Sequence, residues 1–399
     1  MPASPTAATE LANDEEASPS GALRVEKTSD DQPWPDDLRL FLCGDVMTGR
    51  GIDQILPHPG DPVLYERHVN SARTYVELAE RTNGAIPRPV GYDYVWGDSL
   101  AELERAAPAA RIVNLETAIT TSNDVAAKGI NYRMNPRNAE ILTTAKIDCC
   151  VLANNHVLDW GEKGLEETLN VLDAANVARV GAGHNLHEAA GPARIVLPTG
   201  RRILVFAFGF ESSGIPLAWA AGSEPGINVV AEASEDAVGR IAKQVKTFAR
   251  RGDICIASIH WGGNWGYTVP AAQRAFAHDL IDIAEFHAVH GHSSHHAKAI
   301  EVYRGRLILY GCGDFITDYE GIGGYEQFRG DLSMMYLPEF QATGALSALK
   351  MIPFQMRRFR LNQAAPGDAR WLQQRLERES ANFGTHVTLN PDNSLSLAW

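Results

Sequence analysis

Long apolar runs are absent from this 399-residue sequence. A transmembrane helix needs roughly 20 consecutive, mainly apolar residues, and no stretch approaches that composition. The N-terminus also lacks the basic start and the apolar core of a secretory signal. We therefore expect a cytoplasmic protein without a membrane span.

Cysteine is scarce as well. The chain has five cysteines, and no two of them form a Cys-x-x-Cys motif. This pattern predicts neither a disulfide framework nor a thiolate zinc site. We expect buried, reduced thiols, which is the usual state in the cytoplasm. The residues concerned lie mostly in or beside apolar, strand-like runs: Cys43, Cys149, Cys150, Cys255 and Cys312.

Several common catalytic motifs are missing too. There is no Gly-x-Ser-x-Gly elbow, no Walker A loop and no His-Glu-x-x-His pair, so serine hydrolases of the elbow type, P-loop enzymes and zincins are disfavoured. Gly181-Ala182-Gly183 lacks the third glycine of a dinucleotide-binding loop. We interpret it as a turn.

Positive charge is in deficit, since the formal net charge is −13. Residues 1–37 hold nine acidic and two basic residues, which leaves −6 for the remainder. An acidic body argues against nonspecific nucleic-acid binding, so we expect no nucleic-acid partner. An anionic small-molecule or polymer substrate stays compatible with this charge, because a bound metal would supply local positive charge.

The order of the patterns predicts an α/β protein. Residues 1–37 are rich in Ala, Ser, Pro, Glu and Asp, and we expect a disordered acidic tail. Apolar strands then alternate with amphipathic helices, as in 38–43, 98–107, 111–113, 138–145, 149–153 and 164–175. We expect one domain over 38–329, with a long insertion at 51–94. Strands and a helix in 330–399 should form a small C-terminal α+β extension that packs on this domain or completes it.

Four histidines occur within the seven residues from His290 to His296. They follow an amphipathic run over 271–286, and Gly291 suits a sharp turn. Histidines on such a turn can converge on one metal ion. An accidental, solvated histidine cluster is the alternative, and the pattern alone does not separate the two.

Polar side chains recur where apolar strands end. The ends read Gly44-Asp45, Asn114-Leu115-Glu116, Asn154-Asn155-His156 and His260-Trp261. Each has an ordinary explanation, such as a turn cap, a solvated carboxylate or a core histidine. Open α/β sheets place ligand sites beyond the C-terminal ends of their strands, however, and several such ends together favour one shared site.

The residue types at these ends suit divalent metal ions. Carboxylate, amide and imidazole ligands together favour one or two borderline ions such as Mn²⁺, Fe²⁺ or Zn²⁺. A pair of such ions polarises a phosphoryl or carbonyl oxygen and makes hydroxide available near neutral pH. The pattern therefore predicts hydrolase chemistry.

Six motifs in order resemble the poly-γ-glutamate capsule synthesis (CapA-like) family, which belongs to the calcineurin-like metallophosphoesterase superfamily. The resemblance covers about Leu38 to Phe315 and implies a four-layer α/β/β/α sandwich with its metal site at the strand ends. The motifs are Gly44 to Met47, Asn114 to Glu116, Asn154 to His156, His260 to Gly262, Gly291 to His295, and Ile300 to Ile308.

The resemblance also implies roles for individual residues. Asp45 matches the first metal ligand, Glu116 stands at the position of a bridging aspartate, and Asn155 matches the asparagine ligand. His156 would assist the leaving group. His260 and His292 match ligands of a second metal, and His295 closes the set. Asn114 and Asn154 would orient these ligands.

Some positions depart from the family pattern. Met47 replaces a usual histidine, and a thioether is a poor ligand for a hard ion, so we expect one metal position to be weak or empty. Asn264 stands where a glutamate is common, and Ser293-Ser294 interrupts the histidine turn. These changes bear on metal number and rate, not on the fold.

Basic and aromatic residues follow two of the strand ends. Arg50, Lys128, Tyr132 and Arg133 could grip an anionic substrate, although ordinary solvated loop charges would look the same. We therefore weigh two functions. One is a metal-dependent hydrolase of a phosphoester or of an amide in an acidic polymer, acting through metal-bound hydroxide. The other is a non-catalytic component of capsular poly-γ-glutamate assembly or export.

Overall fold

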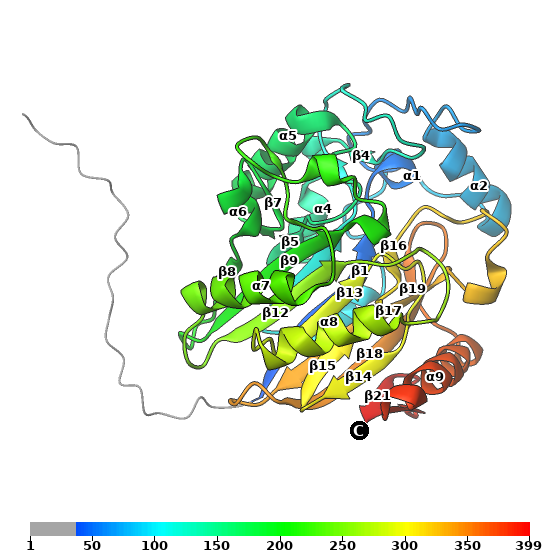
Figure 1. Ribbon diagram of the computed structural model, residues 1–399. Coiled ribbons are helices and arrows are strands. Elements are labelled where there is room, and N and C mark those ends of the chain that lie inside the picture. The colour runs from blue at the N-terminus through cyan, green and yellow to red at the C-terminus, as the bar shows by residue number, and fades with distance from the viewer. Residues whose placement is uncertain (1–36) are drawn as a thin grey trace, which may run out of the picture. The chain divides into compact units, whose positions relative to one another are not determined.

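The computed structural model describes residues 37–399, which contain two large sheets (Figure 1). The predicted acidic tail lies outside the described residues, apart from Asp37. The larger sheet has the strand order β20-β21-β18-β17-β1-β2-β5-β6, with β16 beside β1 and β19 beside β18. Its strands are β1 (Leu38–Val46), β2 (Ala110–Leu115), β5 (Cys149–Val151), β6 (Ala178–Val180), β16 (Asp314–Ile316), β17 (Leu332–Phe340), β18 (Leu346–Met356), β19 (Leu361–Gln363), β20 (His386–Leu389) and β21 (Leu395–Ala398).

The second sheet has the order β11-β9-β12-β13-β15-β14, with β8 beside β9. Its central strands β9, β12, β13 and β15 run parallel, so their C-terminal ends lie at one edge. The strands are β8 (Ala193–Val196), β9 (Arg202–Phe210), β11 (Val229–Val230), β12 (Ile254–His260), β13 (Ala288–His292), β14 (Ile300–Tyr303) and β15 (Arg306–Leu309). Two short pairs complete the strands: β3 (Ala118–Ile119) with β4 (Arg133–Met134), and β7 (Ala182–Gly183) with β10 (Gly226–Ile227).

Alternating side chains on β9 show how the second sheet is covered. Phe206 and Phe208 pack in a cluster with residues of α7 (Glu235–Phe248) and α8 (Ala271–Asp282), and both helices lie across this face in Figure 1. Val205 and Ala207 point the other way and join the core of the larger sheet. Because successive strand residues face opposite sides, one face of β9 meets the helices and the other meets the first sheet.

The core around the larger sheet also includes side chains from elements outside the sheet. Phe41 on β1 packs against Phe315 and, through it, near Trp96, whose indole Nε1 donates to the Ile141 carbonyl at 2.8 Å. The remaining helices are α1 (Arg50–Asp53), α2 (Arg73–Asn83), α3 (Ser99–Ala106), α4 (Glu140–Thr144), α5 (Gly161–Ala174), α6 (Leu186–Ala190) and α9 (Pro366–Ser380).

The predicted α/β class is confirmed. The helices α3 and α5 lie within three residues of their expected bounds. The Ser234 hydroxyl accepts the Ala237 N–H and caps the N-terminus of α7. Residues 332–356 supply β17, which pairs antiparallel with β1, and β18, which pairs antiparallel with β17. The C-terminal segment is thus part of the same sheet as the first strand.

The histidine-rich segment differs from its prediction. His290, Gly291 and His292 lie inside β13, and the turn begins only at Ser293. Gly291 is required for close packing and not for a turn, because a Cβ there would lie 2.5 Å from the Leu309 carbonyl oxygen and 2.7 Å from Trp261 Nε1. The expectation of a turn at Gly291 was wrong because Gly also marks sites where two backbones approach closely.

Other expectations concern burial and membrane insertion. All five cysteines are buried and unpaired, as predicted. Within residues 37–399, no helix combines the length and the apolar character that crossing a bilayer would require.

Candidate metal centre

Five strands deliver polar side chains to one place. Parallel pairing of β1 with β2, of β2 with β5 and of β12 with β13 aligns the ends that carry the predicted motifs. A sixth strand, β16, also pairs with β1, and this pairing sets Asp45 opposite Asp314. The approach is close because Gly44 and Gly313 have no side chains there, and the Asp45 N–H donates to the Gly313 carbonyl at 3.0 Å.

Two sets of metal-ligand atoms share one residue. Asp45, His260 and His292 bring a carboxylate oxygen and two imidazole nitrogens within 4.8 Å of one another. Asp45, His295 and Asp314 bring two carboxylate oxygens and one imidazole nitrogen within the same distance. All five residues except His295 are buried. Asp45 is therefore the carboxylate common to both sets, whereas the resemblance implies Glu116 in that bridging role.

The hydrogen bonds around His292 leave one nitrogen free. His290 Nε2 lies 2.7 Å from the Cys43 carbonyl, which can only accept, so His290 Nδ1 is an acceptor. The Ser258 hydroxyl, 3.0 Å from that Nδ1, donates to it and accepts from His292 Nε2 at 3.0 Å. The Nδ1 lone pair of His292 is left to face the shared site.

His260 reaches the same state by a different route. Its Nε2 lies 2.9 Å from Asn155 Oδ1, an acceptor, so its Nδ1 also carries a lone pair. The two Nδ1 atoms of His260 and His292 lie 2.7 Å apart. Burial lowers the pKa of each imidazole well below the usual value, so neither Nδ1 atom is protonated. Two facing lone pairs at this distance fit a shared cation.

The carboxylates also indicate a cation site. Burial first, and then the Asp314 charge, raise the pKa of Asp45 to about 8. Asp314 Oδ2 is buried and has no hydrogen-bond donor among the described residues. A cation between these groups would remove the repulsion and satisfy the orphaned oxygen. Asp314 also contacts His295, whose Nδ1 lies 3.0 Å from Asp314 Oδ1. Burial acts to lower the pKa of His295, but the Asp314 carboxylate outweighs it and raises that pKa.

Two asparagines form hydrogen bonds around the carboxylates. Asn114 Nδ2 lies 2.7 Å from Asp45 Oδ1 and 2.5 Å from Glu116 Oε2. Asn154 Nδ2 donates in turn to Asn114 Oδ1 at 3.0 Å. Burial, and then the Asp45 charge, raise the pKa of Glu116 well above its usual value. Its other oxygen lies 3.4 Å from His260 Nε2.

His156 lies beside this cluster and outside both ligand sets. Its Nδ1 is 2.7 Å from Asp159 Oδ2, and its ring stacks on Tyr132 with the centroids 3.9 Å apart. A carboxylate can only accept, so Nδ1 carries the hydrogen and Nε2 is the free atom. Burial lowers the pKa of His156 to about 4 despite Asp159, and Lys128 lowers it further.

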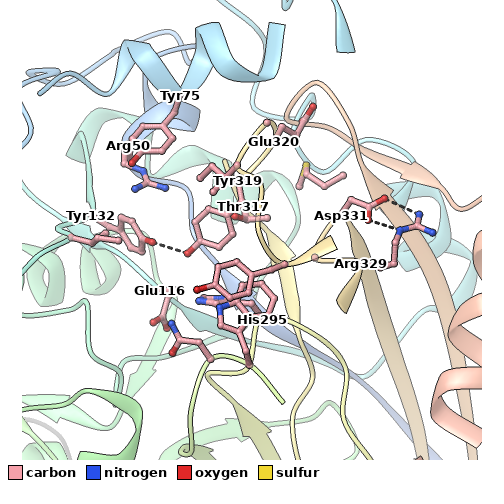
Figure 2. Close-up of a pocket in the computed structure, with 18 of the residues that line it drawn as sticks. Arg50, Tyr75, Glu116, Tyr132, His295, Thr317, Tyr319, Glu320, Arg329 and Asp331 are labelled. Carbon is pink, nitrogen blue, oxygen red and sulfur yellow. Dashed lines mark hydrogen bonds and ion pairs between the residues drawn. The ribbon is translucent and has the colours of Figure 1, made fainter. Parts of the chain in front are cut away.

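A cavity of about 800 Å³ opens over the site (Figure 2). Glu116, Asn155, His156, His260 and His295 lie in its wall. A second group of wall residues extends away from the metal centre: Thr317, Tyr319, Glu320, Tyr325, Arg329 and Asp331.

The four predicted substrate-binding residues are placed differently from one another. Lys128 and Tyr132 line the cavity, and Lys128 Nζ lies 2.8 Å from Asp159 Oδ1. Arg50 also reaches the wall, but its guanidinium is buried and pairs with Asp318 and with Glu66. Arg133 stacks on Trp160 at 3.8 Å and is not part of the wall. Of these four, only Lys128 offers a partly exposed cation beside His156.

Sequence reasoning missed Asp314 and Asp159. Gly313-Asp314 follows an apolar strand in the same way as Gly44-Asp45, and this repeated signal could have found it. Asp159 lies three residues after His156, without a strand end to mark it. Met47 is buried, and its N–H donates to the Ile316 carbonyl.

Comparison with known proteins identifies the family of this chain. The family model described as "Bacterial capsule synthesis protein PGA_cap" matches residues 39–319. The chain belongs to this family. A PGA_cap relative from Mycobacterium tuberculosis (strain H37Rv), named a probable polyglutamine synthesis accessory protein, is 47% identical over 367 residues and is covered to 96%, with 91% of this chain aligned.

Two more distant similarities are also found. The capsule biosynthesis protein CapA of Bacillus anthracis is 24% identical over 70% of this chain and 60% of its own length. A 5'-nucleotidase precursor from Thermus thermophilus superposes with a TM-score of 0.42 at 10% identity, over 80% of this chain and 54% of that one. This chain thus spans about half of that enzyme, and at this TM-score no property is transferred from it.

Proposed function

We propose that this PGA_cap protein is a metal-dependent hydrolase that acts on a phosphoester or on an amide of an acidic polymer. The observation that carries the proposal is the pair of ligand sets that share Asp45, beside a cavity whose wall includes His260 and His295 of these sets and His156, which pairs with Asp159. A divalent ion held there would polarise the oxygen of the scissile group and lower the pKa of a water molecule.

The ligand chemistry favours Mn²⁺, Fe²⁺ or Zn²⁺. Two imidazoles with a carboxylate suit any of these ions, and two carboxylates with one imidazole form a harder set. Asp314 offers the second set a carboxylate that the sequence pattern, with Met47 in place of a histidine, did not predict. We infer that both positions can hold an ion.

His156 is the proposed proton carrier. With Nδ1–H held by Asp159, its Nε2 lone pair can accept a proton from the attacking group and return it to the leaving group. Tyr132 stacks on the ring and fixes its plane. Asp159 would stabilise the imidazolium that forms, which offsets the low pKa of the free ring.

The substrate class follows from the relatives and from the cavity. The relatives are named for polyglutamine synthesis and for capsule biosynthesis, and an acidic polymer or a phosphoester would carry negative charge to the metal ions. Lys128 lines the cavity next to His156 and would contact such an anion. Arg50, which pairs with Asp318 and Glu66, is assigned to holding the wall instead.

The test is hydrolysis of an activated phosphodiester and of γ-glutamyl peptides by the Mn²⁺-loaded chain. We expect His156→Ala to lower kcat by about 10²- to 10⁴-fold, because a positioned acid–base group contributes that much. Metal content should not change, since His156 is in neither ligand set. Asp159→Asn should lower kcat less and shift its pH profile.

His184→Ala is the matched control. His184 also pairs with a carboxylate, Glu188 at 2.8 Å, but it is partly exposed and outside the cavity. Its substitution should leave kcat unchanged. Metal-loaded protein that is inert on both substrate classes would contradict the hydrolase proposal.

That negative result would instead favour an accessory role in capsular poly-γ-glutamate assembly. The name of the mycobacterial relative, an accessory protein, and the departures at Met47 and Asn264 support this second candidate. It predicts that the chain binds an acidic polymer without cleaving it, and that this binding survives His156→Ala.

A further inference from the structure

A second concave site lies at the opposite edge of the second sheet. It has a volume of about 560 Å³ and surrounds the starts of β12 and β13, next to Cys255 and His287. His260, at the other end of β12, belongs to the metal centre. Cys255 and His260 are five positions apart on this extended strand, which corresponds to about 16 Å. The two cavities have no wall residue in common.

Cations dominate the wall of this pocket. Lys246, Arg250, Arg251 and Arg306 line it, against Asp253 and Glu285. Asp253 is already neutralised, because the Arg202 guanidinium pairs with it and Arg202 Nε lies 2.9 Å from its Oδ1. The wall thus carries an excess of positive charge in a chain whose formal net charge is −13.

Two arginines here point at backbone carbonyls instead of carboxylates. Arg201, buried beside the pocket, donates to the Gly252 and Gln341 carbonyls at 3.2 and 3.0 Å. Arg306 is half-buried in the wall, and its nearest acceptor is the Thr343 carbonyl at 3.4 Å. Burial lowers the pKa of both. A carbonyl dipole stabilises a guanidinium charge less than an anion does. The positive charge of these arginines would therefore be stabilised by a bound anion.

His287 also lines this wall, and burial lowers the pKa of its imidazole to about 3, so the ring is neutral. Its Nδ1 accepts the Cys255 N–H at 3.0 Å, which leaves the hydrogen on Nε2. Gly344 packs against this edge of the ring, where any Cβ would lie 2.4 Å from Nε2 and 2.8 Å from Arg306 Nη1. The imidazole edge and the Arg306 fork are therefore neighbours.

We propose that this pocket binds a small polyanion that carries phosphate groups. Several guanidinium forks favour phosphate, because they match its oxygen geometry in bidentate fashion. The pocket is larger than one phosphate group, so two or three linked phosphates fit it better. Such a ligand is either an inorganic oligophosphate or the phosphate tail of a nucleotide, and both present the same oxygens to the arginines.

Calorimetric titration of the full-length, chelator-treated chain with tripolyphosphate, at a fixed salt concentration near 0.1 M, tests the proposal. We expect saturable binding of one ligand per chain. Lys246→Gln combined with Arg306→Gln should weaken it at least tenfold. Lys246→Gln alone should weaken it about threefold, and it keeps the test informative if the Arg306 variant does not fold.

Matched variants separate this site from the metal centre. Lys243→Gln changes an exposed lysine one turn earlier on α7, outside the pocket wall, and should leave the affinity unchanged. Asp45→Asn, in the metal centre, should also leave it unchanged, so the pocket stands or falls independently of the hydrolase proposal. Loss of binding in Asp45→Asn with retention in the pocket variants would overturn the assignment.

Competing ligands define the chemical class. If ATP binds with higher affinity than tripolyphosphate, the ligand is a nucleotide. If the two affinities are equal, the ligand is an inorganic oligophosphate. Either result supports the proposal. Binding of citrate as tight as that of tripolyphosphate would overturn the preference for phosphate. Absence of saturable binding by all three ligands would overturn the site itself.

Discussion

Replacing Asp45 with asparagine is expected to abolish metal binding at both positions and to lower turnover by at least about a thousandfold. Asp45 is the residue common to the two ligand sets, so its loss removes one ligand from each. An amide is a weaker ligand than a carboxylate for a divalent ion, and the activation of water depends on that ion. Elemental analysis of the purified variant gives the ions per chain, and the phosphodiester assay gives the rate.

The fold should survive this substitution. Asn114 Nδ2 can still donate to the new side-chain oxygen, and one of two facing, buried carboxyl groups has gone. We therefore expect the thermal midpoint of the metal-free variant to equal or exceed that of the metal-free parent chain. A variant that loses activity because it unfolds would show the opposite change.

Asp314→Asn is the partner experiment. Asp314 belongs to one ligand set only, with His295, so its substitution should remove one ion and leave the one held by His260 and His292. An unchanged ion count in Asp314→Asn would assign no ligand role to this residue. Equal metal content in Asp45→Asn and the parent chain would contradict the shared site altogether.

The strand ends show how far sequence reasoning reaches. Asp45, His260, His292 and His295 were each expected at one site, because parallel strands align their C-terminal ends, and the structure brings them together. Asn114 and Asn154 were expected to orient the ligands, and their hydrogen bonds run to Asp45 and to each other.

The features that sequence reasoning missed depend on long-range pairing. Asp314 reaches Asp45 because β16 pairs with β1 across about 270 residues of chain. The local Gly-Asp pattern marks Asp314 as a candidate but does not report which strand it pairs with. The same holds for Arg50. Its position beside a strand end suggested a substrate contact, but Asp318, far away in the chain, takes up its charge. Partners of a charged side chain are a property of tertiary packing, which short motifs do not report.

The largest effect on stability is expected from Gly44→Ala. An added Cβ would lie 1.5 Å from the Gly313 carbonyl oxygen and 2.6 Å from the carbon of that carbonyl. Neither neighbour can move freely, since both are backbone and the Asp45 N–H donates to that same oxygen. We expect the free energy of unfolding to fall by at least about 3 kcal/mol, as when atoms are forced into a filled core, or the variant not to fold.

Gly239→Ala provides the opposite result in the same chain. Gly239 lies in α7, where a new Cβ would have no heavy atom within 4 Å. Alanine should there raise the free energy of unfolding by about 0.5 to 1 kcal/mol, through helix propensity and a less flexible unfolded state. Denaturant unfolding followed by circular dichroism measures both variants. If Gly44→Ala is as stable as the parent chain, β1 and β16 do not approach as closely as described. The contact that places Asp45 next to Asp314, and with it the second metal position, would then be contradicted.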